Sequence, residues 1–399
     1  MQTIRHLLFT IFILLTSITL FAQVSNEFKT VSLDGTKSAM FGTSIAIDGD
    51  YAVIGVRVTE HVIGCAYVFK REGTAWKQVQ KLTPPFSEDY DMFGFSVAIS
   101  GDYIVIGAYH SAGKKGYAAI YKLENGNWKY KSQLQHSSLK GSEKFGYSVA
   151  IDGEYVVVGA PWQDVGFSQQ GAAYVYKREG ELWDSKARLL AKDGMESAHF
   201  GWSVSISQRQ ILVGAPGMTI DGGSSQGAVY LFVPDKEIWK PGVRFTQGVS
   251  SDEYGISVDI KDSRFIVGAV NAYADEIGHG AAYIYKYVPK DTMWIMEKKL
   301  ISSTTKFSNY YGSSVSIDGD YALVSDNFDE EKGSHAGAAF LYKYAGGKWV
   351  LQKKMIASDA REEHEFGFAV TLHNHDILIS SPNDEVQAPY SGSVYFYKY

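Results

Sequence analysis

Short apolar runs separated by turn dipeptides recur along the whole chain, and seven of them follow an aromatic residue joined to a glycine. In the clearest copy, Phe145-Gly146 precedes an apolar run that ends at Ile151, the turn Asp152-Gly153, and a second run, 155–158. An Asp-Gly dipeptide between two such runs is a favoured two-residue β-hairpin turn. An apolar run without polar alternation is typical of a strand buried on both faces. Each copy is therefore predicted to begin with a hairpin whose second strand lies in the interior.

The copies keep a fixed register and recur every 52 to 57 residues. The aromatic-Gly pairs are Phe41-Gly42, Phe93-Gly94, Phe145-Gly146, Phe200-Gly201, Tyr254-Gly255, Tyr311-Gly312 and Phe366-Gly367. Thirteen residues after the glycine of each pair stand Gly55, Gly107, Gly159, Gly214, Gly268, Ser325 and Ser380. A variable loop then leads to an aromatic-rich third strand, and in six copies a Trp opens a fourth. Each repeat is thus one four-stranded unit.

Seven four-stranded antiparallel units predict an all-β fold, a seven-bladed β-propeller. Only six Trp strands are present, because the chain ends at Tyr399, just after the third strand of the last copy. The stretch from Glu27 to Leu33 is predicted to supply the missing outer strand and close the ring, with Phe28 in the place of Trp. The small first strands would line the central channel. A closed ring has no free sheet edge, so we expect a monomer.

Residues 1–22 have the pattern of a secretory signal peptide, in which Arg5 and His6 precede an apolar run that ends at Ala22. The alternative is a membrane anchor, for which the run is short. We expect a secreted or periplasmic protein with no membrane span after cleavage, and with residues 23–399 forming one propeller domain. The formal net charge of −6 argues against a nucleic-acid partner. Cys65 is the only cysteine and is predicted to be a buried strand residue.

The aromatic-Gly pair followed by Gly159-Ala160-Pro161 and its counterparts resembles the FG-GAP repeat, the blade of integrin α-subunit head propellers and of many bacterial exported proteins. The resemblance covers essentially the whole mature chain and implies a propeller. Integrin-type blades often hold calcium in an Asp-x-Asp-x-Asp-Gly loop between the first two strands. The corresponding turns here are tight hairpins such as Asp48-Gly49, which cannot supply six to eight oxygen ligands. We therefore expect no metal site and no cofactor.

The loops that vary most in length share one face of an up-and-down propeller, so binding is expected there. These loops are acidic, most densely at 326–331 and 359–365. The acidity indicates either a docking surface for a cationic partner or cation, or a solvated rim, and it disfavours a polyanion. Large aromatic residues are the second signal, since exposed rings bind sugars or proteins unless they pack between blades. The candidate binding residues are Trp162, Tyr109, Tyr90, Tyr273, Phe328 and Tyr390.

The sequence favours an exported binding propeller whose partner is an extracellular protein or a glycan. The alternative is a carbohydrate-active enzyme, most simply a polysaccharide lyase, in which His110, Tyr109 and Arg57 would abstract and return a proton. This alternative rests on fold analogy. The sequence contains no phosphate-binding loop and no zinc-protease, Cys-x-x-Cys or Gly-x-Ser-x-Gly motif. The two hypotheses differ in whether the three candidate catalytic side chains converge.

Overall fold

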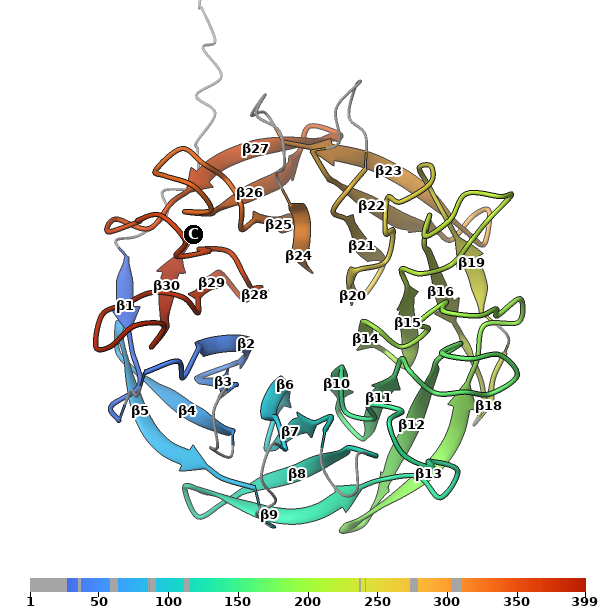
Figure 1. Ribbon diagram of the computed structural model, residues 1–399, viewed down its shortest axis with the longest axis horizontal. Helices are drawn as coiled ribbons and strands as arrows, with labels where there is room; N and C mark the ends of the chain where they lie inside the picture. Colours follow the sequence, from blue (N-terminus) through green and yellow to red (C-terminus); the bar gives the residue numbers. More distant parts are fainter. Residues whose placement is uncertain are drawn as a thin grey trace, which may run out of the picture.

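The computed structural model describes residues 27–34, 37–57, 64–84, 86, 91–110, 115–236, 238–240, 242–272, 279–302 and 310–399. In these ranges the regular secondary structure is β-strand throughout, and none of them holds a helix that could span a membrane. Seven four-stranded antiparallel sheets stand around a central channel (Figure 1). The predicted seven-bladed propeller is confirmed. The predicted signal peptide lies outside the described residues.

Blades 1 to 6 run outward from the channel in chain order, and blade 7 runs outward through β28, β29 and β30 to β1 (Figure 1). Blades 1 to 3 consist of β2 (Phe41–Asp48), β3 (Tyr51–Val56), β4 (Cys65–Glu72) and β5 (Ala75–Leu82); β6 (Phe93–Ser100), β7 (Tyr103–Ala108), β8 (Tyr117–Glu124) and β9 (Asn127–Leu134); and β10 (Val149–Asp152), β11 (Tyr155–Ala160), β12 (Ala172–Glu179) and β13 (Leu182–Leu189). Blades 4 and 5 consist of β14 (Val204–Ser207), β15 (Gln210–Ala215), β16 (Ala228–Phe232) and β19 (Val243–Phe245); and β20 (Ser257–Lys261), β21 (Arg264–Ala269), β22 (Ala281–Val288) and β23 (Met293–Ile301). Blades 6 and 7 consist of β24 (Tyr311–Asp318), β25 (Tyr321–Asp326), β26 (Ala338–Ala345) and β27 (Lys348–Met355); and β28 (Val370–His373), β29 (Asp376–Ser381), β30 (Ser393–Lys398) and β1 (Phe28–Thr30).

The outer strand of blade 4 is the irregular one. Trp239 belongs to a separate two-stranded ribbon, β17 (Pro234–Asp235) with β18 (Ile238–Trp239), while β19 pairs with β16. The sequence has Pro241 between these segments, and a proline has no backbone N–H for a strand ladder. The predicted single Trp strand is therefore divided here.

The N-terminal strand closes the ring, as predicted, because β1 pairs antiparallel with β30. Phe28 lies opposite Phe396. The equivalent pair in blade 1 is Gln80 opposite Val68, so Phe28 occupies the position of Gln80 and not that of Trp76. The prediction that Phe28 takes the place of the outer-strand Trp is therefore wrong. Leu33 is 77% exposed, so it does not take the place of the large apolar residue either. The closing strand is only three residues long, and its pairing with β30 sets its register.

The thirteen-residue spacing of the motif reflects the contact between consecutive blades. The aromatic residue of every pair is fully buried. Ser148 donates a hydrogen bond of 2.8 Å to the carbonyl oxygen of Gly201, the glycine of the next pair. A Cβ atom on Gly159 would lie 2.0 Å from the same oxygen. The same arrangement occurs at Gly55, Gly107, Gly214 and Gly268. Only a residue without a side chain permits this approach of the next blade.

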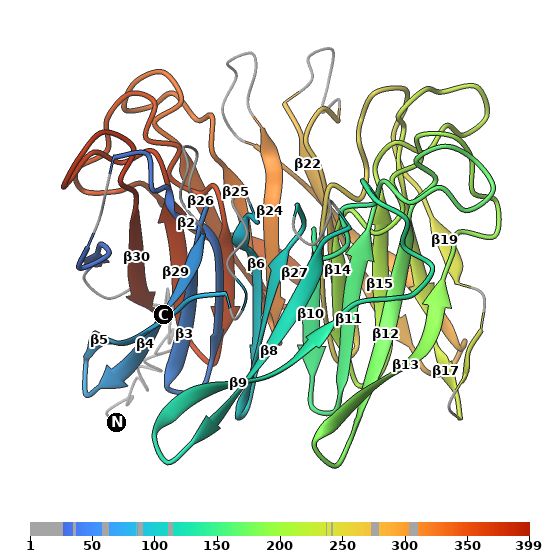
Figure 2. The ribbon, with the colours of Figure 1, turned by 60° about the horizontal axis from the view of Figure 1, so that its bottom comes forward.

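The short hairpin turns also join neighbouring blades. The carboxylate of Asp48 accepts a hydrogen bond from the backbone N–H of Gly101 at 2.6 Å. Asp152 and Asp318 accept corresponding bonds from the next blade at 2.7 Å. These turns lie on one face of the ring, and the long loops lie on the other (Figure 2). The Asp residues of the turns therefore fasten one blade to the next.

Candidate functional site at the loop-face mouth of the channel

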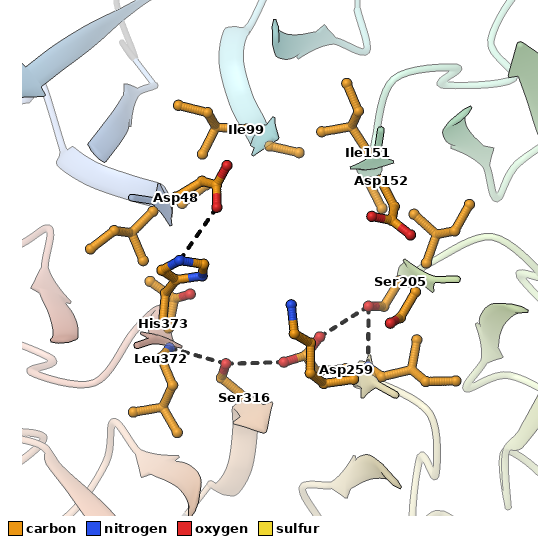
Figure 3. Close-up of a pocket in the computed structure, with 18 of the residues that line it drawn as sticks. Asp48, Ile99, Ile151, Asp152, Ser205, Asp259, Ser316, Leu372 and His373 are labelled. Carbon is orange, nitrogen blue, oxygen red and sulfur yellow. Dashed lines mark hydrogen bonds and ion pairs between the residues drawn. The ribbon is translucent and has the colours of Figure 1, made fainter. Parts of the chain in front are cut away.

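The central channel is lined by four residues from each first strand and encloses about 290 Å³. Asp259 of β20 stands where other blades have Ala, Ser or Thr. Its carboxylate accepts hydrogen bonds from the hydroxyls of Ser205 and Ser316, both at 3.0 Å (Figure 3). It also accepts one from the N–H of Ile317 at 2.8 Å. Burial raises the pKa of Asp259, and these hydrogen bonds oppose that rise. Because donors from blades 4 and 6 satisfy it, Asp259 connects three blades inside the channel.

The mouth of the channel on the loop face is formed by the two residues that flank each aromatic-Gly pair. These residues precede the channel-lining segment of each first strand and so lie at the end away from the hairpin turns. The preceding residues are Met40, Met92, Lys144, His199, Glu253, Tyr310 and Glu365, and the following ones are Thr43, Phe95, Tyr147, Trp202, Ile256, Ser313 and Phe368. Six of the preceding residues have φ between 52° and 54°, the left-handed region that non-glycine residues rarely adopt. The backbone thus presents different side chains from equivalent positions.

Six rings from blades 2 to 4 gather at this mouth. Tyr147 is central: its ring centroid lies 5.6 Å from Tyr109, 5.2 Å from Trp162 and 4.9 Å from Trp202. Phe95 lies 4.5 Å from Tyr109, and His199 lies 5.2 Å from Trp162. All six side chains are partly exposed. We call this group the aromatic shelf; it comprises Phe95, Tyr109, Tyr147, Trp162, His199 and Trp202.

Two cations border the aromatic shelf. The ammonium of Lys144 lies 4.0 Å from the ring centroid of Trp162 and 5.2 Å from that of Tyr109. Burial lowers the pKa of Lys144. Burial, and then the charge of Lys144, lower the pKa of His199, which favours a neutral imidazole at pH 7. Arg57 places its guanidinium 3.4 Å from the sulfur of Met40, on the blade 1 side.

A hollow of about 530 Å³ adjoins the aromatic shelf between blades 4 and 5. His199 and Trp202 form its boundary with the shelf, and Thr219, Ser224 and Glu253 supply polar groups. Burial raises the pKa of Glu253. A volume of this size is typical of a small-molecule pocket. Shelf and hollow together form a continuous candidate site across blades 2 to 5.

Of the candidate binding residues, Tyr109 and Trp162 both lie in the aromatic shelf and both contact Tyr147 and Lys144. Phe328 lies on blade 6, where it stacks on His335 at 4.1 Å and contacts Tyr310 at 4.4 Å. Tyr390 is 46% exposed in the loop before β30. Tyr90 and Tyr273 lie outside the described residues. The structure therefore joins two of the candidates and separates two.

The candidate catalytic residues lie near one another on blades 1 and 2. The charge of Arg57 lowers the pKa of Tyr109, but burial has the larger effect and raises it, so the phenol stays protonated at neutral pH. His110 is exposed, and its ring centroid lies 6.3 Å from that of Tyr109. Tyr109 packs into the shelf, whereas His110 contacts Tyr109 and is exposed to solvent. This arrangement suits Tyr109 as a hydrogen-bond donor rather than a base.

Sequence reasoning missed Phe95, Lys144, Tyr147, His199 and Trp202. These residues directly flank the aromatic-Gly pairs, in a segment interpreted only as the start of a channel-lining strand. The available signal was the residue after the glycine, which is Phe, Tyr or Trp in blades 2, 3, 4 and 7.

The acidic runs of the loop face are partly neutralised inside the protein. The ammonium of Lys354 lies 2.8 Å from carboxylate oxygens of both Asp329, which is buried, and Glu331. Asp359 pairs with Lys29 at 2.5 Å and accepts a hydrogen bond from Tyr395 at 2.8 Å. Within the described ranges, no group of three His, Cys, Asp or Glu side chains is arranged to hold a metal ion. These runs therefore serve blade packing as well as surface charge.

Seven closed blades with variable side chains around one mouth define a binding or interaction propeller. The chain belongs to the FG-GAP repeat family, whose sequence model matches residues 24–69, 76–121, 128–176, 183–232, 294–342 and 349–397. No curated protein sequence matches the chain. Among solved structures, one described as "a putative 6-phosphogluconolactonase from Bacteroides uniformis" has a TM-score of 0.53 and 11% identity, covering 79% of this chain and 85% of that one. That likeness concerns the fold alone.

Proposed function

We propose that this protein is an exported propeller that binds a glycan on the aromatic shelf. The observation that carries the proposal is the contact network of Tyr109, Tyr147, Trp162 and Trp202, which gathers partly exposed rings at one mouth. Aromatic faces offer large apolar contact area with a polar edge, which matches the alternating C–H and hydroxyl surface of a sugar ring. Export is proposed from the pattern of residues 1–22.

The hollow beside the shelf supports a saccharide in preference to a protein partner. A stable protein interface buries roughly 800 Å² on each partner and needs a broad complementary surface. The candidate site instead combines rings with a hollow of about 530 Å³ that is bordered by hydroxyl, carboxyl and imidazole groups. Small-molecule sites have this composition, with apolar walls and a few placed polar groups. A sugar could stack on the shelf while its hydroxyls bond to Thr219, Ser224 and Glu253.

The test is a glycan-array screen of residues 23–399, followed by titration of tryptophan fluorescence with each hit. Trp162→Ala should weaken binding about ten-fold or more, since stacking of a nucleic-acid base on an aromatic ring is worth ~1–3 kcal/mol and we expect a comparable gain for a sugar ring. Phe328→Ala is the matched control, because Phe328 occupies the same position in blade 6 as Trp162 in blade 3 but lies outside the shelf.

The outcomes separate the possible functions. Glycan binding that Trp162→Ala weakens and Phe328→Ala spares supports the proposal. An equal loss of glycan affinity in both variants would contradict it. The absence of any glycan binding would also contradict it and would favour a protein partner. A rise in absorbance near 235 nm on incubation with a bound acidic polysaccharide would indicate elimination chemistry and return the lyase alternative.

A further inference from the structure

The blade 1 to blade 3 side of the mouth brings together two cations and two phenols. Arg57 and Tyr109 occupy the same position in consecutive blades, two residues after Gly55 and Gly107. Lys144 begins the next blade and lies 5.2 Å from the ring of Tyr109, whose centroid is 5.6 Å from that of Tyr147. Three successive blades therefore direct hydrogen-bond donors to one region.

Neither cation forms an ion pair with a carboxylate of the described residues. Among the described residues, Arg57 donates only to the thioether sulfur of Met40, a weak acceptor, and its Nε is buried without a hydrogen-bond partner. Two other partly buried arginines are paired with carboxylates: Arg71 bonds to Asp376 at 2.9 Å, and Arg264 to Glu297 at 3.1 Å. Arg178 and Arg209 instead donate to backbone carbonyl oxygens, which Arg57 does not do among the described residues. A guanidinium with unused donors beside aromatic rings is suited to an incoming planar or tetrahedral anion.

The two phenols add neutral donors to the same region. The charge of Arg57 acts on both Tyr109 and Tyr147, but burial raises the pKa of each phenol above its ordinary value. Both hydroxyls therefore remain protonated at neutral pH and can donate to an anion. This is the donor set of an oxyanion subsite with two charges and two neutral O–H groups.

We infer that this group is an anion subsite and that the glycan is an acidic oligosaccharide, whose carboxylate or sulfate is bound by Arg57, Lys144 and the hydroxyls of Tyr109 and Tyr147. The inference rests on the proposed function, because it specifies the ligand of the same shelf. It also explains why a site on an acidic loop face can accept an anion.

Charge is segregated around the mouth. The residue directly before the aromatic-Gly pair is neutral or basic in blades 1 to 4, namely Met40, Met92, Lys144 and His199. The equivalent residue is acidic in blades 5 and 7, namely Glu253 and Glu365. A short oligosaccharide fits with its anionic sugar at Arg57 and its neutral sugars across the shelf to the hollow. A long polyanion would extend over the carboxylates of the opposite blades and be repelled. The predicted ligand is therefore an oligosaccharide with one or a few acidic sugars.

The experiment compares three probes by calorimetric titration of residues 23–399: a short neutral oligosaccharide that carries one terminal uronic acid, the same oligomer after reduction of its carboxyl, and the same neutral oligosaccharide carrying one sulfate ester. Wild-type protein should bind an acidic probe at least about ten-fold more tightly than the reduced oligomer, because a charge-assisted hydrogen bond contributes more than a neutral one. The two acidic probes distinguish a carboxylate from a sulfate.

The variants locate the subsite. Arg57→Leu should abolish the preference for the acidic probe, Arg57→Lys should retain part of it, and Tyr109→Phe should reduce it several-fold. Arg188→Leu is the control, because it makes the same change in net charge on the exposed outer strand β13. If Arg57→Leu fails to fold, Arg57→Lys and Tyr109→Phe carry the test.

Equal affinity for the acidic and reduced oligomers would overturn the anion subsite and leave the proposed glycan function standing. A preference for the acidic probe that survives Arg57→Lys and Tyr109→Phe unchanged would place the anion elsewhere and overturn the assignment. Absence of binding to all three probes and to the glycan array would overturn both proposals.

Discussion

Asp326 at the end of β25 provides a test of how a carboxylate is accommodated in the interior of a blade. It stands where blades 2 to 5 have Ala108, Ala160, Ala215 and Ala269, and it is fully buried. One of its oxygens accepts the N–H of Tyr310 at 3.2 Å, and the other has no hydrogen-bond partner among the described residues. Burial, and then the charge of Asp329, raise its pKa from 3.8 to about 8.

The raised pKa fixes the sign of a pH effect on stability. The folded protein holds this proton from pH 4 to about pH 8, whereas the unfolded chain releases it near pH 4. The contribution of Asp326 to stability is therefore greatest below pH 4 and is lost as pH rises through 8. Each pKa unit corresponds to ~1.4 kcal/mol. Between pH 5 and pH 8 the wild type should lose roughly 4 kcal/mol that Asp326→Ala does not lose.

The assay is urea denaturation at pH 5, 6.5 and 8, with the unfolding free energy of Asp326→Ala measured relative to wild type at each pH. Taking the difference cancels the titration of the other groups. Alanine suits the position, because four other blades have it there. Asp376→Ala is the control: it removes the buried partner of Arg71, away from Asp326, and should destabilise at every pH. A difference between Asp326→Ala and wild type that stays constant with pH would refute the reasoning.

Three further predictions concern the joints between blades. Gly159→Ser should lower the free energy of unfolding by about 3 kcal/mol or more, because its Cβ would lie 2.0 Å from the carbonyl oxygen of Gly201. The converse change, Ser325→Gly, should lower it far less in the same thermal melts. Asp259→Ala should lower the free energy of unfolding by roughly 1–3 kcal/mol, because it leaves the channel donors Ser205 and Ser316 without their acceptor. Asp259→Asn keeps one acceptor oxygen and should lower it less. Equal losses in the two variants would argue against a stabilising role of these hydrogen bonds. Deleting residues 23–34 should expose the edge of β30 and produce dimers or aggregates in size-exclusion chromatography, and a monomer of unchanged melting temperature would contradict the closing role of β1.

The fold could be predicted from the sequence because the repeated residues contact one another across each boundary between blades. A glycine such as Gly159 faces the carbonyl of Gly201 in the next blade, so both positions must recur at a fixed spacing. The register of β1 could not be read in this way. It is set by three backbone pairs with β30, and no side-chain pattern in so short a strand distinguishes neighbouring registers.

The candidate site was only half predictable for a related reason. Tyr109 and Trp162 were found because they lie in loops whose length varies. Tyr147 and Lys144 were missed because they lie within the conserved register of the motif, where each blade keeps the backbone and changes the side chain. That these two meet Tyr109 depends on the rotation from blade to blade, which sequence spacing along one chain does not give.

The same geometry explains how a rigid ring can carry a changeable binding site. The glycine-to-carbonyl contact and the buried aromatic residue hold the backbone on either side of residues such as Lys144, His199 and Glu253, which share φ values of 53° to 54°. The side chains at these positions make few demands on the fold, and their chemistry ranges from ammonium to imidazole to carboxylate. Exchange at these positions should therefore change what the mouth recognises with little change in stability. Lys144→Glu should lower affinity for an acidic saccharide while leaving the melting temperature nearly unchanged, whereas a substitution two residues later, at Gly146, should unfold the joint between blades.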